Sequence, residues 1–365
     1  MLSRRGILLF ICCIGCLILL PINEIYAEKS PFDKRDVVYF GATFPSEYYR
    51  GMLSDSSIKG LSVETTATEM YNYWDELVEN YPYLIEKKDL GLCSDGIQHI
   101  YEYDIKPQTY KWTDEKVKIQ SPEVLIISGQ HGYEKASSMG LYYFVRDLIE
   151  NCNKNDSLGW LKGNIYFKII PICNPFGWNN SNYLNYNGVN LNRNYDTIGF
   201  PATIEAKPWE REYGGNVPFD QPETQIVRNF VFDNLNAVLF IDFHTYEYDV
   251  VESAWYIKWN ELMDIDDQYY KRANFAITTH INRQTIEFER QFSINVGPLC
   301  VGYQTLGDSS FPSADAWVTS QNIVGMIVEG FTGFPEGELF TPEVIQANSQ
   351  IIGNVIINLI CELMK

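Results

Sequence analysis

The sequence is poor in basic residues and in histidine. It has 28 lysines and arginines against 47 aspartates and glutamates, and four histidines among 365 residues, for a formal charge of −19 at pH 7. Binding to nucleic-acid phosphates needs clustered lysine and arginine, so this balance argues against a nucleic-acid ligand. Acidity alone indicates solubility and names no substrate.

Internal repeats, low-complexity tracts and an excess of proline or glycine are also missing. The chain has 16 prolines and 25 glycines, while 45% of its residues are hydrophobic. These features exclude a disordered or fibrous protein and fit one large domain or two modest ones.

Cysteine is too scarce outside the N-terminal segment to suggest a disulfide framework. Of eight cysteines, three lie in the first 16 residues, and the others are Cys93, Cys152, Cys173, Cys300 and Cys361. Five cysteines cannot all pair internally, and their spacing matches no known framework. Cys173 stands in an apolar stretch and is expected to be a small buried hydrophobe.

One apolar segment stands at the N-terminus. Arg4 and Arg5 precede the 14-residue run Ile7–Leu20, Pro21 interrupts it, and Ala27 offers a cleavage point. This order is typical of a secretory signal, whereas an uncleaved anchor is the rival interpretation with a run that is short for a bilayer. We therefore predict a cleaved signal peptide over 1–27, a secreted protein and no stable membrane partner.

The remaining chain divides into a polar extension over 28–62 and a predicted catalytic domain over 63–365. Patterns of helical and strand spacing alternate along this domain. Helices are expected at 67–81, 134–151, 222–235, 270–282 and 341–364, and strands at 97–105, 123–129, 164–172, 237–244 and 322–330. Alternation of this kind predicts an α/β fold, a three-layer sandwich with a mixed, mostly parallel central sheet and helices on both faces.

Four of the predicted apolar strands each end at a polar residue or at one that can bind a metal. These residues are His131, Asn174, His244 and Glu329. Because ligands of such sheets bind beyond the carboxyl ends of the strands, these side chains are expected to gather at one edge.

His131, Glu134 and His244 have the composition of a catalytic zinc site. Such sites take three His or carboxylate ligands and leave one position for water. A further carboxylate, Glu329, is the candidate for moving the proton of that water. The alternatives are ordinary: one HxxE spacing is weak by itself, a histidine at a strand end is often a hydrogen-bonded surface residue, and Glu329 could be a solvated acid.

Seven motifs in this order also resemble those of the carboxypeptidase A-like zinc metallocarboxypeptidases, from about Thr65 to about Ile356. They are "GQHGYEKAS", "IPICNPFGW", "GVNLNRNYD", "YGGNVPFDQPETQIVRNFV", "FIDFH", "GYQTLGDSSFPSADAW" and "IVEGFTG".

The resemblance implies a role for each matching residue. It makes His131, Glu134 and His244 the ligands of one Zn²⁺, Glu329 the general base and acid, and Asn192, Arg193 and Tyr303 the substrate-binding residues. A planar guanidinium suits a terminal carboxylate, because it forms two parallel hydrogen bonds with it. The alternatives are a surface salt bridge for Arg193 and ordinary packing for Tyr303.

Two departures from the family pattern stand out. Asn190 replaces the acid that orients the first histidine ligand, and Asp242, two residues before His244, is a possible electrostatic substitute. Digestive members also carry an oxyanion-stabilising arginine between the positions of Asn174 and Asn192, where this chain has neither arginine nor lysine. Zinc or another group, such as Arg211, would then bear that charge.

The expected activity is hydrolysis of the C-terminal peptide bond of a peptide with a free carboxylate. The alternatives are a peptidase of bacterial cell-wall peptides of the γ-glutamyl-diaminopimelate type and a non-catalytic peptide- or glycan-binding module. Side-chain preference would be set between 307 and 316, where Asp308 and Asp315 would hint at basic substrates; the equal alternative for either residue is a solvated acid.

Several other residues are expected to play no catalytic part. His99 and His280 have structural positions, and Asp264–Gln268 lacks the other ligands of a calcium loop. Ser309 and Ser310 lack a nucleophile elbow, so we expect no serine hydrolase.

Overall fold

The computed structural model describes residues 8–13, 16–21, 49, 51, 61–107, 121–200, 206–245, 257–259, 312–321, 323–330 and 342–363. The chain forms two compact units, Met1–Asp36 and Val37–Lys365. The first contains strands β1 (Leu8–Cys13) and β2 (Cys16–Pro21), which pair antiparallel. Within the described residues, no helix combines the length and apolar character needed to cross a membrane.

A seven-stranded sheet forms the centre of the second unit, in the order β3-β4-β6-β5-β7-β9-β8. Its strands are β3 (Ile85–Leu92), β4 (His99–Ile105), β5 (Glu123–Ser128), β6 (Tyr166–Ile170), β7 (Leu239–Thr245), β8 (Ile257–Trp259) and β9 (Val324–Gly330). β6, β5, β7 and β9 are parallel neighbours, whereas β4 and β8 run antiparallel to theirs. This confirms the predicted mixed, mostly parallel sheet.

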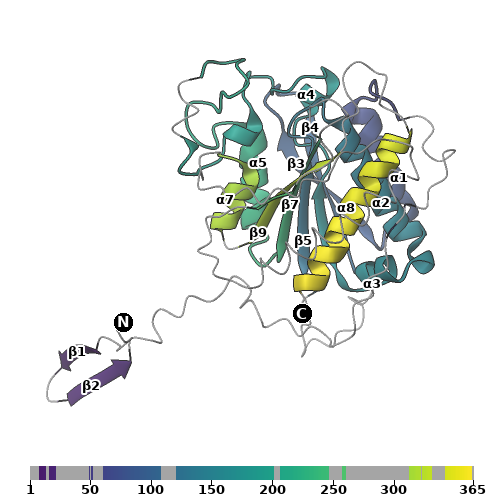
Figure 1. The fold of residues 1–365 in the computed structure, drawn as a ribbon. Helices are drawn as coiled ribbons and strands as arrows, with labels where there is room; N and C mark the ends of the chain where they lie inside the picture. Colours follow the sequence, from purple (N-terminus) through teal and green to yellow (C-terminus); the bar gives the residue numbers. More distant parts are fainter. Residues whose placement is uncertain are drawn as a thin grey trace. The chain divides into compact units, whose positions relative to one another are not determined.

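Helices cover both faces of the sheet (Figure 1). On one face lie α1 (Ala67–Asn80), α2 (Lys135–Glu150), α3 (Asp156–Asn164) and α8 (Pro342–Leu363), and on the other α5 (Pro222–Phe232) and α7 (Ala314–Ser320). Three short helices lie between these elements: η4 (Cys152–Lys154) follows α2, α4 (Pro175–Asn179) follows β6, and η5 (Leu191–Arg193) follows α4. The three-layer arrangement agrees with the predicted fold class, while the helix expected over 270–282 lies outside the described residues.

Buried apolar side chains join these layers. β5 and β7 contribute Leu125, Ile127 and Phe240, on which Phe230 of α5 and Trp317 of α7 pack within one buried cluster. A strand buried on both faces reads as a continuous apolar run, which is what "VLII" of β5 is. The core therefore fixes β5 and β7 side by side, with their carboxyl ends at one edge.

Tyr49 is fully buried against helices α2 and α8, although it belongs to the predicted extension 28–62. Its hydroxyl donates to Asp147 Oδ2 at 2.6 Å, and its backbone N–H and carbonyl both bond to the amide of Asn354. Its ring meets Phe144 edge-on at 5.9 Å. This part of the extension is thus an integral part of the core.

Candidate metal centre

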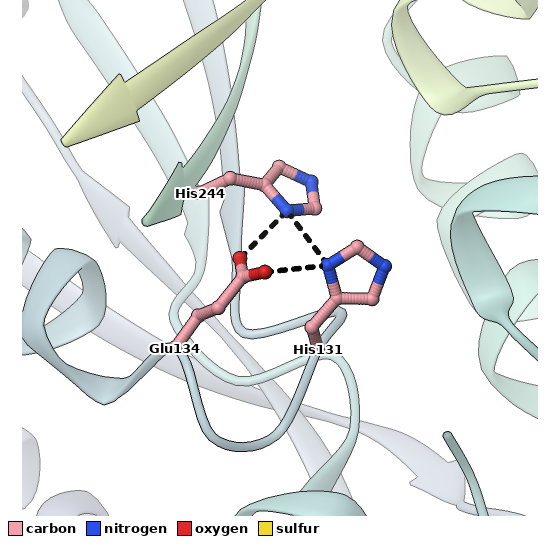
Figure 2. Close-up of side chains that lie close together, drawn as sticks. All are labelled: His131, Glu134 and His244. Carbon is pink, nitrogen blue, oxygen red and sulfur yellow. Dashed lines mark hydrogen bonds and ion pairs between the residues drawn. The ribbon is translucent and has the colours of Figure 1, made fainter. Parts of the chain in front are cut away.

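The loop between β5 and α2 carries two of the predicted ligands, and the end of β7 carries the third. His131 and Glu134 come from that loop and His244 from the strand (Figure 2). The loop lies tightly against α4, since a Cβ on Gly132 would stand 1.8 Å from the carbonyl carbon of Gly177. Close backbone approach of this kind requires glycine between the two ligands.

The three side chains converge on one point (Figure 2). Glu134 Oε1 lies 2.8 Å from His131 Nδ1, Glu134 Oε2 lies 2.8 Å from His244 Nδ1, and the two Nδ1 atoms are 3.2 Å apart. One ligand atom from each residue lies within 4.8 Å of the other two, and all three residues are buried. The predicted convergence of these distant residues is confirmed.

The chemistry of this donor set fits zinc. Two imidazole nitrogens and a carboxylate are the ligands of a three-residue catalytic zinc site. Both histidines turn Nδ1 towards the shared centre, and each turns Nε2 towards another polar side chain. His131 Nε2 lies 3.1 Å from Asn190 Oδ1, and His244 Nε2 lies 2.9 Å from Asp242 Oδ2. Metal-ligating histidines are usually oriented through the second nitrogen in this way.

The charges of the three groups are strongly coupled. Burial favours the neutral acid, but the adjacent His131 and His244 outweigh it and lower the pKa of Glu134 to about 2. Burial lowers the pKa of His131, against the attraction of Glu134. Burial also acts to lower the pKa of His244, but Asp242 and then Glu134 reverse the effect and raise it well above its ordinary value. The site therefore concentrates negative charge around His244.

Glu329, the predicted general base, lies on the strand next to His244. In the parallel pair of β7 and β9, His244 and Glu329 are register partners. Paired residues of adjacent strands project on the same face of a sheet. Glu329 is half-buried, whereas the three converging residues are buried.

Two of the three predicted substrate-binding residues, Arg193 and Asn192, lie among the described residues. Arg193 Nε donates to Glu212 Oε2 at 2.7 Å, with Arg193 16% and Glu212 55% exposed. The salt bridge that was the alternative for Arg193 is therefore present. Asn192 is buried, and its Oδ1 accepts from the backbone N–H of Ala314 at 2.9 Å. Tyr303 lies outside the described residues.

A stack of side chains covers His131, and sequence reasoning did not identify it. The ring of Tyr183 lies on the imidazole of His131 with centroids 3.8 Å apart and planes at 18°. The Arg211 guanidinium carbon lies 4.6 Å from the Tyr183 ring centroid. Burial, and then the charge of Glu134, raises the pKa of the Tyr183 phenol to about 12. The sequence predicts Arg211 only as one group that could replace the missing arginine. Nothing in "NNSNYLNYN" distinguishes Tyr183 from the exposed Tyr186.

The residues expected to be structural are located only in part. His99 of β4 pairs with Asp89 of the edge strand β3, with Nδ1 2.9 Å from Oδ1. Asp315 is fully buried in the first turn of α7, where Ser313 donates to it at 2.5 Å, so it is a packed helix-start residue. Outside the described residues lie His280, Asp264–Gln268, Asp308, Ser309 and Ser310.

Comparison with known families and proteins gives consistent matches. The family model described as zinc carboxypeptidase, peptidase M14, matches residues 70–309. Human carboxypeptidase O is 23% identical over 226 residues, which cover 54% of this chain and 56% of that protein. A Schizosaccharomyces pombe protein named inactive metallocarboxypeptidase ecm14 is 26% identical over 204 residues, covering 50% of this chain and 40% of that protein. The chain thus matches about half the length of these relatives, and the family match ends before Glu329.

The fold is similar to that of solved carboxypeptidases. The crystal structure of carboxypeptidase A from Helicoverpa armigera superposes with a TM-score of 0.62 at 16% identity, covering 95% of this chain and 82% of that one. At this identity the likeness concerns the fold alone.

Proposed function

The chain belongs to the zinc carboxypeptidase family, and on that premise we propose that it is a secreted, zinc-dependent carboxypeptidase. It would hydrolyse the C-terminal peptide bond of peptides that end in a free carboxylate. The observation that carries the proposal is the convergence of His131 Nδ1, His244 Nδ1 and the Glu134 carboxylate within ligand distance of a common point. In a cluster with a purely structural role, two imidazoles would not need to face a common centre while separate side chains, Asn190 and Asp242, contact their outer nitrogens.

The metal would be held by these three side chains. A zinc ion there supplies a Lewis acid for the scissile carbonyl and acidifies a water molecule. Glu134 remains ionised over the physiological range because its pKa is held at about 2. Its charge stabilises the cation throughout that range.

Glu329 is the proposed general base. Its register with His244 puts its carboxylate on the adjacent strand and on the same face as a metal ligand. From there it would accept the proton of the attacking water and pass it to the leaving amine. Its partial exposure is consistent with contact with substrate.

Arginines near the site would recognise the anionic end of the substrate. Arg193 is proposed to bind the terminal carboxylate, in competition with its present partner Glu212. Arg211, which lies over Tyr183, is proposed to supply the positive charge that residues 175–191 lack. Tyr183 would hold Arg211 by a cation–π contact and shield the outer face of His131.

Export rests on the N-terminal sequence alone. Arg4, Arg5 and the apolar run Ile7–Leu20 support a signal peptide that ends at Ala27. We propose that the mature protein acts outside the cell.

Cell-wall peptides form the second candidate substrate class. The lack of arginine and lysine at 175–191 departs from digestive members of the family. Together with the predicted export, this departure favours cell-wall peptides of the γ-glutamyl-diaminopimelate type.

Digestion of a peptide library by the full mature chain, read by mass spectrometry, tests the proposed activity. The library contains free and C-terminally amidated versions of the same peptides, together with diaminopimelate-containing peptides. Loss of single C-terminal residues from the free peptides only is the expected result. Zinc binding without any cleavage would instead favour the non-catalytic alternative, for which the inactive relative in Schizosaccharomyces pombe offers a precedent.

A further inference from the structure

The only acid that directly contacts an outer imidazole nitrogen of this site lies behind His244, as far as the described residues show. His244 Nε2 is 2.9 Å from Asp242 Oδ2, whereas His131 Nε2 faces the neutral amide oxygen of Asn190 at 3.1 Å. Asp242 and Asn190 are both fully buried. The two histidines are therefore supported by partners of different charge.

Asp242 is held by a short chain of buried polar groups. Gln130 Nε2 donates to Asp242 Oδ2 at 2.6 Å, and Gln130 Oε1 accepts from the Tyr195 hydroxyl at 2.9 Å. Because Gln130 directly precedes His131, this chain joins the β5 loop to β7. Gln130 and His244 thus contact the same oxygen of the Asp242 carboxylate.

The other carboxylate oxygen, Asp242 Oδ1, is buried and has no hydrogen-bond partner among the described residues. A buried carboxylate with so few donors is costly unless a positive charge lies near it. The imidazole of His244 lies between this carboxylate and the metal centre, because its Nε2 contacts Asp242 and its Nδ1 faces the centre. It can therefore connect the carboxylate to a positive charge at the centre. The arrangement suits a carboxylate whose charge is balanced through that histidine.

We propose that Asp242 is a positioning residue of the zinc site, held in place by Gln130 and Tyr195. It orients His244 so that Nδ1 faces the metal, and through its contact with His244 Nε2 it supplies the negative charge that Asn190 cannot supply behind His131. The inference rests on the proposed function, because it takes zinc as the occupant of the site. Sequence supports the geometry, since residues two apart on a strand share a face.

Zinc affinity, measured by competition with a chromophoric chelator at fixed pH, tests the proposal in the full mature chain. Asp242→Asn removes the charge but keeps an oxygen that can accept from both Gln130 and His244. Loss of such a partner typically weakens metal binding by about 10- to 100-fold, and we expect a loss of this size.

The decisive variant combines Asp242→Asn with Asn190→Asp. This double variant moves the carboxylate from behind His244 to behind His131 and is expected to recover most of the lost affinity. A purely structural role of Asp242 would not be rescued by a change at Asn190, which lies in the loop before η5. As a spectroscopic readout, the visible bands of the cobalt-substituted protein are expected to change in Asp242→Asn, because the negative charge next to His244 Nε2 is lost.

Asp89→Asn is the matched control, since it removes the same charge from the His99–Asp89 pair of β4 and the edge strand β3. Its zinc affinity is expected to equal that of the wild type. Should Asp242→Asn fail to fold, Gln130→Met leaves the carboxylate but removes its amide donor, and a smaller loss of zinc affinity is expected.

Two outcomes would overturn the inference: wild-type zinc affinity in Asp242→Asn, or no recovery in the double variant when both are folded. For Gln130→Met as the sole folded variant, unchanged zinc affinity would do the same. A wild-type chain that binds no zinc at all would instead refute the proposed function, so the two failures are distinguishable.

Discussion

The ion pair between Arg193 and Glu212 leads to a prediction about substrate affinity. If Arg193 binds the terminal carboxylate of the substrate, Glu212 competes with that carboxylate for the same guanidinium. Glu212 is 55% exposed and contacts Arg193 Nε at 2.7 Å. Pairs with an exposed partner are worth about 0.2–1 kcal/mol.

Removing the competitor should therefore strengthen binding by the same amount. In Glu212→Gln, we expect KM for a peptide with a free C-terminus to fall by a factor of about 1.4 to 5, since 1.4 kcal/mol corresponds to tenfold. kcat should stay within about twofold, because the change acts on ground-state and transition-state binding alike. Initial rates over a range of peptide concentrations give both parameters.

The chain offers a matched control for this experiment. Arg146 Nε and Glu150 Oε2 form a similar pair at 3.0 Å on helix α2. Glu150→Gln should leave KM unchanged. If KM rises in Glu212→Gln, Glu212 positions Arg193 rather than competing with the substrate, and if KM does not change, Arg193 does not bind the carboxylate.

Three further predictions concern the base, the protons and the core. Glu329→Gln should lower kcat by about 10²- to 10⁴-fold while one zinc per chain is retained, and near-wild-type turnover would exclude it as the base. At neutral pH, zinc binding should release about one proton, because the raised pKa of His244 leaves it protonated in the metal-free chain whereas Glu134 is already ionised. The apparent Kd for zinc should thus increase as pH falls through that pKa, and calorimetry in buffers of different ionisation enthalpy that detects no proton release would contradict this. Tyr49→Phe should cost about 1–3 kcal/mol of unfolding free energy in urea, because the buried Asp147 loses its hydroxyl donor, whereas the change should be small in Tyr186→Phe, whose side chain is exposed.

Sequence patterns predicted the central part of the fold well. β5, β7 and β9 contain the apolar runs "VLII", "LFI" and "MIV", and α1 carries the capping residues Thr66 and Glu69, whose reciprocal bonds are present. Strong periodicity and buried runs identify such elements before any tertiary contact is known. The same runs predicted that His131, His244 and Glu329 would lie at strand ends.

Elements with weak patterns were missed. β3 reads "IEKKDLGL", without apolar alternation, and a bulge between Asp89 and Gly91 disturbs its pairing. α3 contains Gly159 and Gly163, which lower helix propensity, so only its packing determines its structure. α4 and α7 are too short to show a period.

Sequence could not have specified the surroundings of the site either. The stack of Tyr183 on His131 depends on side-chain orientation across separate elements. The contact of Asp242 with His244 is different, because both residues lie on β7 and their spacing already suggested an electrostatic role for Asp242. The burial of Tyr49 depends on contacts with α2 and α8 that only the assembled fold creates. Such contacts leave no periodic signal along the chain.

Zinc analysis of the dialysed, mature protein by plasma mass spectrometry tests the central claim most directly. We expect about one zinc per wild-type chain, near-complete loss of zinc in His244→Ala, and full retention in His99→Ala. A wild-type chain without zinc, or a His244→Ala variant that keeps it, would contradict the assignment of His131, Glu134 and His244 as a metal site.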